Sequence, residues 1–127
     1  MTNTTHMLVD EIEDILDFTR DKLFDVIAGL PQTNDVKELP SDSGLYFFMD
    51  HVTDEILYIG QSVDIKSRWQ GRRDFLPGGE RQVHYLLNWQ KGYKLYDKDA
   101  LEAITIFLFR PKFNQRFRGK VNHDIER

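Results

Sequence analysis

Four side chains in this sequence suit the chemistry of phosphate esters: two tyrosines, an arginine and a glutamate, at Tyr46, Tyr58, Arg68 and Glu102. A carboxylate can hold a divalent cation, which polarises a phosphate and stabilises the oxygen that leaves it. The rigid fork of an arginine matches the non-bridging phosphate oxygens, and a tyrosine hydroxyl adds a hydrogen-bonding group. Together these groups are the parts that phosphoryl transfer requires.

The two tyrosines lie on a predicted β-hairpin. Residues Gly44–Met49 and Ile56–Gly60 are short runs of aromatic and β-branched residues, which favour strands, and the polar segment Asp50–Glu55 between them is typical of a turn. An antiparallel pairing of the strands would bring Tyr46 and Tyr58 near each other. Packing within the hairpin is the alternative role for both side chains, because tyrosine favours strands.

Arg68 lies on a helix that is expected directly after the hairpin. Ser62 suits the N-cap position of this helix, which runs through Trp69 to an interruption at Gly71. The arginine would either serve the site or form an ion pair with Asp64, one turn earlier.

Glu102 lies in a predicted helix, Asp99–Phe109, which is otherwise strongly apolar and which Pro111 ends. Burying a carboxylate is costly unless it is paired or binds a metal, so a buried Glu102 favours a cation site. The alternative is a capping box, in which Asp99 caps the helix and Glu102 accepts a hydrogen bond from a backbone N–H.

The charge of the chain is divided unevenly along its length, although the net charge is only −4. Residues 1–55 hold 13 Asp and Glu against 3 Lys and Arg, whereas residues 56–127 hold 8 against 14. A polyanion such as a nucleic acid is therefore expected to meet the second half and to be repelled by the first. The alternative is an ordinary solvated surface of scattered basic residues.

Composition excludes several classes of protein. The chain has no cysteine, which excludes disulfides, thiolate metal sites and a cysteine nucleophile. No apolar run approaches the ~20 residues that span a bilayer, and the first residues lack the basic start and apolar stretch of a signal peptide. We therefore expect a cytoplasmic protein with no membrane partner.

An acidic amphipathic helix is predicted from Met7 to Leu30, because apolar residues recur there every three or four positions with acidic residues between them. Gly29 and Pro31 supply its stop signals. The helix would pack on the domain, mediate a homodimer or hold a protein partner, and the sequence leaves these roles open.

The rest of the chain is divided by its turn-forming residues. We expect an N-terminal helix over 1–30, a linker over 31–43 and one domain over 44–127. Within that domain, a loop is expected at 77–79, a helix over Arg81–Gln90, and a short extended segment from Phe113.

Four elements of the sequence resemble the GIY-YIG nuclease family, and they occur in the family's order. Gly44-Leu45-Tyr46 and Tyr58-Ile59-Gly60 resemble the two halves of its signature, and the run that ends at Arg68 resembles its strand-to-helix segment. Leu101–Asn114 resembles a later block with a metal-binding glutamate and a downstream Pro-x-x-Asn. The resemblance covers about residues 43–116. Within the family, the chain resembles the N-terminal nuclease domain of bacterial excision-repair endonucleases and small stand-alone relatives.

The resemblance implies a metal-dependent endonuclease that acts on DNA. Its fold would be α/β (α+β), with a small central antiparallel β-sheet flanked by helices, here with an extra N-terminal helix. Glu102 would hold one Mg²⁺ or Mn²⁺, hard cations that prefer oxygen ligands. Tyr46 would orient or deprotonate the attacking water, and Tyr58 would hydrogen-bond the phosphate or a metal-bound water.

Four further residues receive roles from the same resemblance. Arg68 would neutralise charge that develops in the transition state. Asn114 would orient the site or brace the backbone. Gly60, like Gly44, would allow the chain to approach its neighbours closely.

Two positions depart from the family pattern. Gln61 and Arg72 stand where many relatives carry Lys and His or Tyr, respectively. We place both, together with Gly60 and His84, among the substrate-binding residues, and His84, beyond a loop, is also a candidate to replace a missing donor or base. The departures support an alternative function, that of a catalytically weak or inactive nucleic-acid-binding module.

Overall fold

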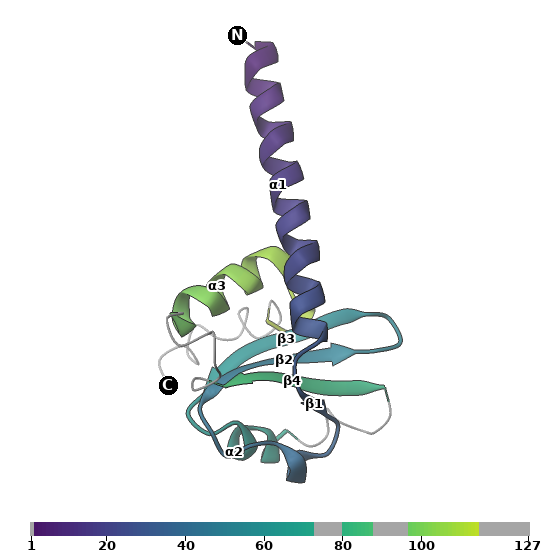
Figure 1. The fold of residues 1–127 in the computed structure, drawn as a ribbon, viewed down its shortest axis with the longest axis vertical. Helices are drawn as coiled ribbons and strands as arrows, with labels where there is room; N and C mark the ends of the chain where they lie inside the picture. The colour runs from purple at the N-terminus through teal and green to yellow at the C-terminus, as the bar shows by residue number, and fades with distance from the viewer. Residues whose placement is uncertain (1, 73–79, 88–96, 115–127) are drawn as a thin grey trace.

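The computed structural model describes residues 2–72, 80–87 and 97–114 and shows a mixed α+β fold (Figure 1). Its helices are α1 (Thr2–Ala28), the 3₁₀ helix η1 (Val36–Glu38), α2 (Ile65–Gln70) and α3 (Lys98–Phe109), and its strands are β1 (Gln32–Thr33), β2 (Gly44–Asp50), β3 (Glu55–Ser62) and β4 (Arg81–Leu87). The strands form one antiparallel sheet in the order β1-β4-β2-β3. The predicted fold class and the β2–β3 hairpin are therefore confirmed.

The helix predicted over Arg81–Gln90 is wrong for residues 81–87, which form strand β4, and residues 88–90 lie outside the described residues. The spacing of Val83, Leu86 and Leu87 fits one face of a helix as well as a strand. β4 lies inside the sheet and is buried on both faces, so its apolar residues do not alternate strictly.

A bulge in β3 brings Tyr58 onto the face of the sheet that Tyr46 occupies. Phe48 pairs with Tyr58 and Met49 pairs with Ile56, which leaves Leu57 as an extra residue in the ladder. Leu57 and Tyr58 consequently both pack in the same apolar cluster as Tyr46. In a regular strand, these two consecutive residues would point to opposite faces of the sheet.

The two faces of the sheet are covered by different elements (Figure 1). The first face packs against α2 and η1 through a cluster that includes Tyr46, Phe48 and Trp69. The second packs against the C-terminal end of α1 and against α3 through Ile27, Leu30, Leu45, Phe47 and other residues of its own cluster. Candidate site residues of the sheet can therefore lie together only if they point to the same face or reach the edge of the sheet.

Residues 31–43 are not a simple linker, in contrast to the sequence-based expectation. They contribute β1, which pairs with β4, and the helix η1, which Asp35 caps. Leu39 is buried in the core. The prolines and polar residues of this segment therefore mark tight turns within the domain, not a boundary between domains.

Helix α1 is confirmed, although it begins at Thr2 and not at Met7. Only its C-terminal end joins the core, through Ile27, and the rest projects beyond the sheet (Figure 1). None of the described helices is long and apolar enough to cross a membrane.

The two shorter helices begin at different caps from those expected. Asp64, not Ser62, caps α2 by accepting a hydrogen bond from the Ser67 N–H. Asp97 caps α3 by accepting from the N–H groups of Asp99 and Ala100. The capping box proposed for Asp99 and Glu102 is therefore not formed, because the helix starts two residues earlier.

Helix α3 is half exposed and not buried as expected. Ile104 and Phe107 are 50% and 55% exposed, whereas Leu101 and Ile106 pack on the sheet. Residues 112–114 are helical, so the extended segment expected from Phe113 is wrong at residues 113 and 114, and its continuation lies outside the described residues.

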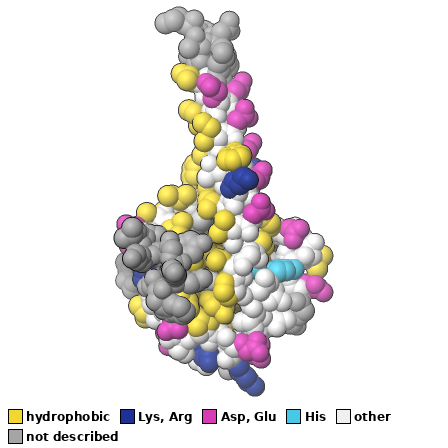
Figure 2. Space-filling view, in the orientation of Figure 1, with side chains coloured by type: hydrophobic (Ala, Val, Ile, Leu, Met, Phe, Trp, Pro, Cys, Tyr) yellow, Lys and Arg dark blue, Asp and Glu magenta, His cyan; other side chains and the backbone are white. Residues whose placement is uncertain are grey.

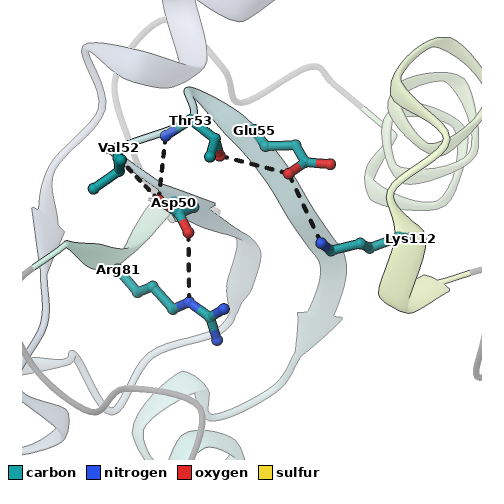
Figure 3. A network of polar contacts seen from close by, with 6 residues as sticks. All are labelled: Asp50, Val52, Thr53, Glu55, Arg81 and Lys112. Atoms are coloured by element: carbon teal, nitrogen blue, oxygen red, sulfur yellow. Dashed lines mark hydrogen bonds and ion pairs between the residues drawn. The ribbon is translucent and has the colours of Figure 1, made fainter.

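At the turn of the β2–β3 hairpin, charged groups are paired within the chain (Figure 3). Asp50 accepts hydrogen bonds from the N–H groups of Val52 and Thr53 and lies 3.7 Å from the Arg81 guanidinium. At the start of β3, Lys112 lies 3.9 Å from the Glu55 carboxylate. This network fixes the turn and ties β2 to β4.

Candidate active site

The opposite end of the hairpin opens on a cleft of about 680 Å³ between β3, α2 and α3. Its lining includes Tyr58, Arg68 and Glu102, three of the five residues predicted to be catalytic. Two of the predicted substrate-binding residues, Gly60 and Gln61, also line it. Residues from distant parts of the sequence thus meet at one surface.

Tyr46 lies beneath this cleft and does not line it. Its side chain is fully buried and packs against Trp69, with ring centroids 5.5 Å apart, and against Tyr58, at 6.0 Å. Tyr46 and Gly60 are cross-strand partners. A Cβ atom at position 60 would stand 2.6 Å from the Tyr46 hydroxyl oxygen, so only glycine leaves room for the ring.

The Tyr46 hydroxyl keeps its proton at neutral pH. Burial raises the pKa of Tyr46 to about 12, and Tyr58 adds to this, whereas the nearby Arg68 guanidinium opposes it. The hydroxyl oxygen has no hydrogen-bond partner of good geometry among the described residues, although Arg68 lies close enough to act on it. A buried, protonated hydroxyl suits the positioning of Arg68 better than the deprotonation of water.

Arg68 connects the cleft to a second hollow on the same side of the molecule. This hollow, of about 550 Å³, is lined by Arg68 together with Arg72, Ser67 and other residues of α2 and the segment before it. Burial lowers the pKa of the Arg68 guanidinium, but the hydroxyls of Tyr46 and Tyr58 outweigh this effect and raise it, so the side chain is a permanent cation. Its Nε is buried without a partner of good geometry among the described residues.

The alternative role of Arg68, an ion pair with Asp64, is not the arrangement found. The Asp64 carboxylate accepts hydrogen bonds from the backbone N–H and from the hydroxyl of Ser67, and so serves the start of α2. The guanidinium faces the cleft instead.

A second carboxylate accompanies Glu102. The Gln61 side-chain amide donates to Asp99 Oδ1 at 2.6 Å and to Glu102 Oε1 at 2.9 Å, so the two acids share one nitrogen. Burial raises the pKa of Glu102, the hydrogen bond from Gln61 lowers it, and Asp99 raises it again, with a net increase. Asp99 was missed as a site residue because it was considered only as a cap, although acids three positions apart share one helical face.

These oxygens fit a hydrated divalent cation. No group of three or more His, Cys, Asp and Glu side chains gathers in the part of the chain that the structure describes. Mg²⁺ and Mn²⁺ nevertheless require only one or two carboxylates when waters and phosphate oxygens complete the shell. Asp99 and Glu102 supply that number, and their mutual repulsion favours a positive charge between them.

Asn114 braces the backbone of β3 and does not line the cleft. Its Oδ1 accepts from the Ile59 N–H at 2.8 Å, and its Nδ2 donates to the Ile59 carbonyl at 2.9 Å. Because Ile59 lies between Tyr58 and Gly60, this paired contact holds the strand that carries two residues of the cleft.

Arg72 and His84 occupy different places. The Arg72 guanidinium lies 5.8 Å from the centre of the Tyr58 ring, beside the cleft. His84 is fully buried in β4 on the opposite face of the sheet, so the structure does not bring it to the site. Its Nδ1 donates to the Ile27 carbonyl, and because the ring is neutral its Nε2 accepts from His51 Nε2, at 2.9 Å for both bonds. His84 therefore anchors α1 to the sheet.

Comparison with protein-family models, with curated proteins and with solved structures found no match to this chain.

Proposed function

We propose that the chain is a metal-dependent endonuclease that hydrolyses phosphodiester bonds in DNA at the cleft between β3, α2 and α3. The observation that carries this proposal is the meeting of Tyr58, Arg68, Asp99 and Glu102 around one open cleft, above a tyrosine that a glycine accommodates. Catalysis of phosphoryl transfer consists largely of positioning and electrostatic stabilisation, and these are the groups that provide both.

Each residue has a defined part in the proposed reaction. Asp99 and Glu102 would hold one Mg²⁺ or Mn²⁺, which would polarise the phosphate and stabilise the leaving oxygen. Arg68 would pair with the non-bridging oxygens as charge builds on them, and the protonated Tyr46 beneath it would fix its direction. Tyr58, on the wall of the cleft, would hydrogen-bond the phosphate or a metal-bound water.

The proposed substrate is a polyanion because of the charges beside the cleft. Arg68 and Arg72 both line the adjoining hollow, so a second phosphate of the same strand would meet a second guanidinium. The excess of basic over acidic residues in 56–127 would also attract a polyanion, over a longer range than these two guanidinium groups.

The test is cleavage of supercoiled and branched DNA in the presence of Mg²⁺ or Mn²⁺ by the full chain. Glu102→Ala and Arg68→Ala should each abolish cleavage without altering the thermal unfolding of the protein. Glu55→Ala and Arg81→Ala are matched controls, since they remove the same residue types from the turn end of the hairpin. Cleavage that survives both site variants would exclude the cleft as the source of activity.

One observation favours an alternative function, that of a nucleic-acid-binding module without catalysis. The Gln61 amide already bridges the two carboxylates and so stands where a cation would neutralise them. This module would bind DNA with a strong dependence on salt but would not cleave it with any metal. Restoration of cleavage by Gln61→Lys, a cation beside the acids, would support an inactive scaffold, whereas turnover by the wild type would exclude it.

A further inference from the structure

The projecting part of α1 carries a continuous apolar surface that the rest of the described chain does not cover. The exposed apolar side chains on this helix include Leu8, Val9, Ile12, Ile15, Leu16, Phe18 and Val26, with exposed fractions from 36% to 63%. Singly exposed apolar residues are ordinary, but a row of them along a free helix is typical of an interaction surface.

The spacing of these residues matches a helix-pairing seam. Val9, Ile12, Leu16, Thr19, Leu23 and Val26 alternate at intervals of three and four residues. This is the repeat that lets one helix lie along another with its side chains interlocked. The seam runs for most of the length of α1.

Most acidic residues of α1 lie away from this seam, and Glu13 flanks it. Figure 2 shows hydrophobic side chains along one edge of the helix and acidic side chains along the opposite edge. Asp10, Asp14, Asp21 and Asp25 belong to the polar side, where they remain solvated if the seam is covered. A partner helix could therefore cover the apolar edge without burying a carboxylate.

The distribution of charge along α1 favours one direction of pairing of two copies over the other. Before Asp17, the described side chains of α1 include four acids, Asp10, Glu11, Glu13 and Asp14, and no base. The two basic residues of the helix, Arg20 and Lys22, follow. Parallel copies would set these four acids beside four acids, whereas antiparallel copies set them beside the half of α1 that holds both bases, together with Asp17, Asp21 and Asp25.

We propose that α1 pairs with α1 of a second copy of this chain, in antiparallel orientation, along the seam from Val9 to Val26. Antiparallel pairing places Leu16 against the partner's Thr19, and Ile12 against the partner's Leu23. Glu13 and Arg20 flank the seam on the same side, seven residues apart, so Glu13 of each copy faces Arg20 of the other. Such an interface is self-complementary, as a two-fold dimer requires.

The apolar surface continues from the seam onto α3. A hollow of about 360 Å³ between the two helices is lined by Leu16, Phe107 and Leu108 together with Glu13 and Arg20. A second helix along the seam would lie at the border of this hollow and shield part of it from water. Shielding of this hollow favours an interface that includes the part of α1 around Leu16.

The first test is the mass of the full chain in solution by sedimentation equilibrium. The expected mass is twice the 15.1 kDa of one chain. Ile12→Asp should return it to that of one chain while the circular dichroism of the sheet is unchanged, because Ile12 is exposed in the single chain. A wild-type mass of one chain at high protein concentration would overturn the proposal.

The second test is a charge exchange, which does not depend on an apolar substitution. Glu13→Lys and Arg20→Glu should each raise the dissociation constant of the dimer by about tenfold, equivalent to ~1.4 kcal/mol. The double variant, which exchanges the two charges, should restore wild-type affinity. Asp14→Lys, on the polar side of the helix, is the matched control. Failure of the double variant to recover would contradict the antiparallel pairing.

The third test determines direction and exploits the absence of cysteine from the chain. Leu16→Cys and Thr19→Cys variants, mixed under oxidising conditions, should form the mixed disulfide in preference to either homodimer. Homodimeric disulfides of Leu16→Cys alone would indicate parallel helices and overturn the proposed orientation. None of these three tests measures DNA cleavage, so their outcome is independent of the proposed function.

Discussion

The two ends of the β2–β3 hairpin contain the same kinds of charged residue, but these residues are paired differently at each end. At the turn, Asp50 pairs with Arg81 and accepts two backbone hydrogen bonds, and Glu55 pairs with Lys112 (Figure 3). At the cleft, Glu102 shares one amide donor with another acid. The charged groups at the turn are paired within the chain, whereas the buried Tyr46 hydroxyl and the buried Arg68 Nε beside the cleft have no hydrogen-bond partner of good geometry among the described residues.

This difference separates polar groups that are paired within the chain from buried polar groups that are not. Buried or half-buried polar groups in folded proteins nearly always find partners, so a buried hydroxyl and a buried Nε without good partners, at Tyr46 and Arg68, need an explanation. They lie together beside two carboxylates and an open cleft, which is the arrangement expected at a functional site. Arginine and carboxylate content alone does not distinguish the two ends.

The largest expected difference between the two ends concerns activity. Arg68→Lys should reduce the rate of DNA cleavage by about 10²-fold or more, because lysine keeps the charge but loses the fork that matches phosphate oxygens. Arg81→Lys should leave the rate unchanged. Single-turnover cleavage of a plasmid measures both. Equal rates for the two variants would show that the fork at position 68 does not take part.

The next effect concerns the fit of Tyr46 under the cleft. Gly60→Ala should destabilise the fold by about 1–3 kcal/mol, because the added methyl group overlaps the Tyr46 ring. Gly71→Ala is the control, since a Cβ there meets nothing closer than 3.9 Å and the backbone φ is an ordinary −81°. Urea unfolding gives the free energy of each. The double variant Gly60→Ala, Tyr46→Phe should not recover the lost stability, because a Cβ atom at position 60 would also lie 2.7 Å from the ring carbon Cζ at position 46.

A third effect is a dependence of stability on pH near the turn end, where His84 meets His51. Burial lowers the pKa of His84 to about 4 from 6.5, the Ile27 carbonyl opposes this shift, and His51 adds to it. The unfolded chain therefore binds a proton at position 84 before the folded chain does. Stability should be complete above pH 6.5 and fall as the pH decreases towards 4, by on the order of 2 kcal/mol.

The measurement is the free energy of unfolding in urea at a series of pH values. The Asp50 carboxyl, whose pKa is lowered mainly by the hydrogen bond from Val52, gives its own loss only at still lower pH, so the two effects separate. In His84→Gln the fall between pH 6.5 and 4 should disappear. A fall of the same size in that variant would assign the effect to another group.

The smallest expected effect is that of an exposed ion pair. Lys112→Ala should change stability by less than ~1 kcal/mol, because Lys112 and Glu55 are both about half exposed and their atoms lie 3.9 Å apart. Thermal unfolding at low and high salt measures it. A larger loss would mean that the Lys112 ammonium group, which lies 5.9 Å from the centre of the Phe113 ring, contributes through a cation–π contact.

The hairpin and the grouping of Tyr58 with Arg68 could be predicted from the sequence because their signals are local. Short aromatic runs around a polar turn specify paired strands, and a helix directly after β3 limits where Arg68 can lie. The position of Glu102 required the resemblance to a family, since no local signal relates it to the hairpin.

Other features depend on contacts between distant segments and could not be predicted in this way. The sequence of strand β4 predicts a helix, because a strand that is buried on both faces loses its alternation. The burial of Tyr46 follows from pairing with Gly60, and the exclusion of His84 follows from the sheet face on which it falls. Asp99 is free to serve the site because Asp97, and not Asp99, caps α3.

The paired contact between Asn114 and Ile59 has a consequence for self-association. β3 is an outer strand of the sheet, and such a strand exposes N–H and C=O groups to which any extended peptide can add. The Asn114 amide occupies one complete donor–acceptor pair at the middle of this row. A side chain of residue 114 thus imitates a neighbouring strand, and its presence discourages the edge-to-edge stacking by which sheet proteins aggregate.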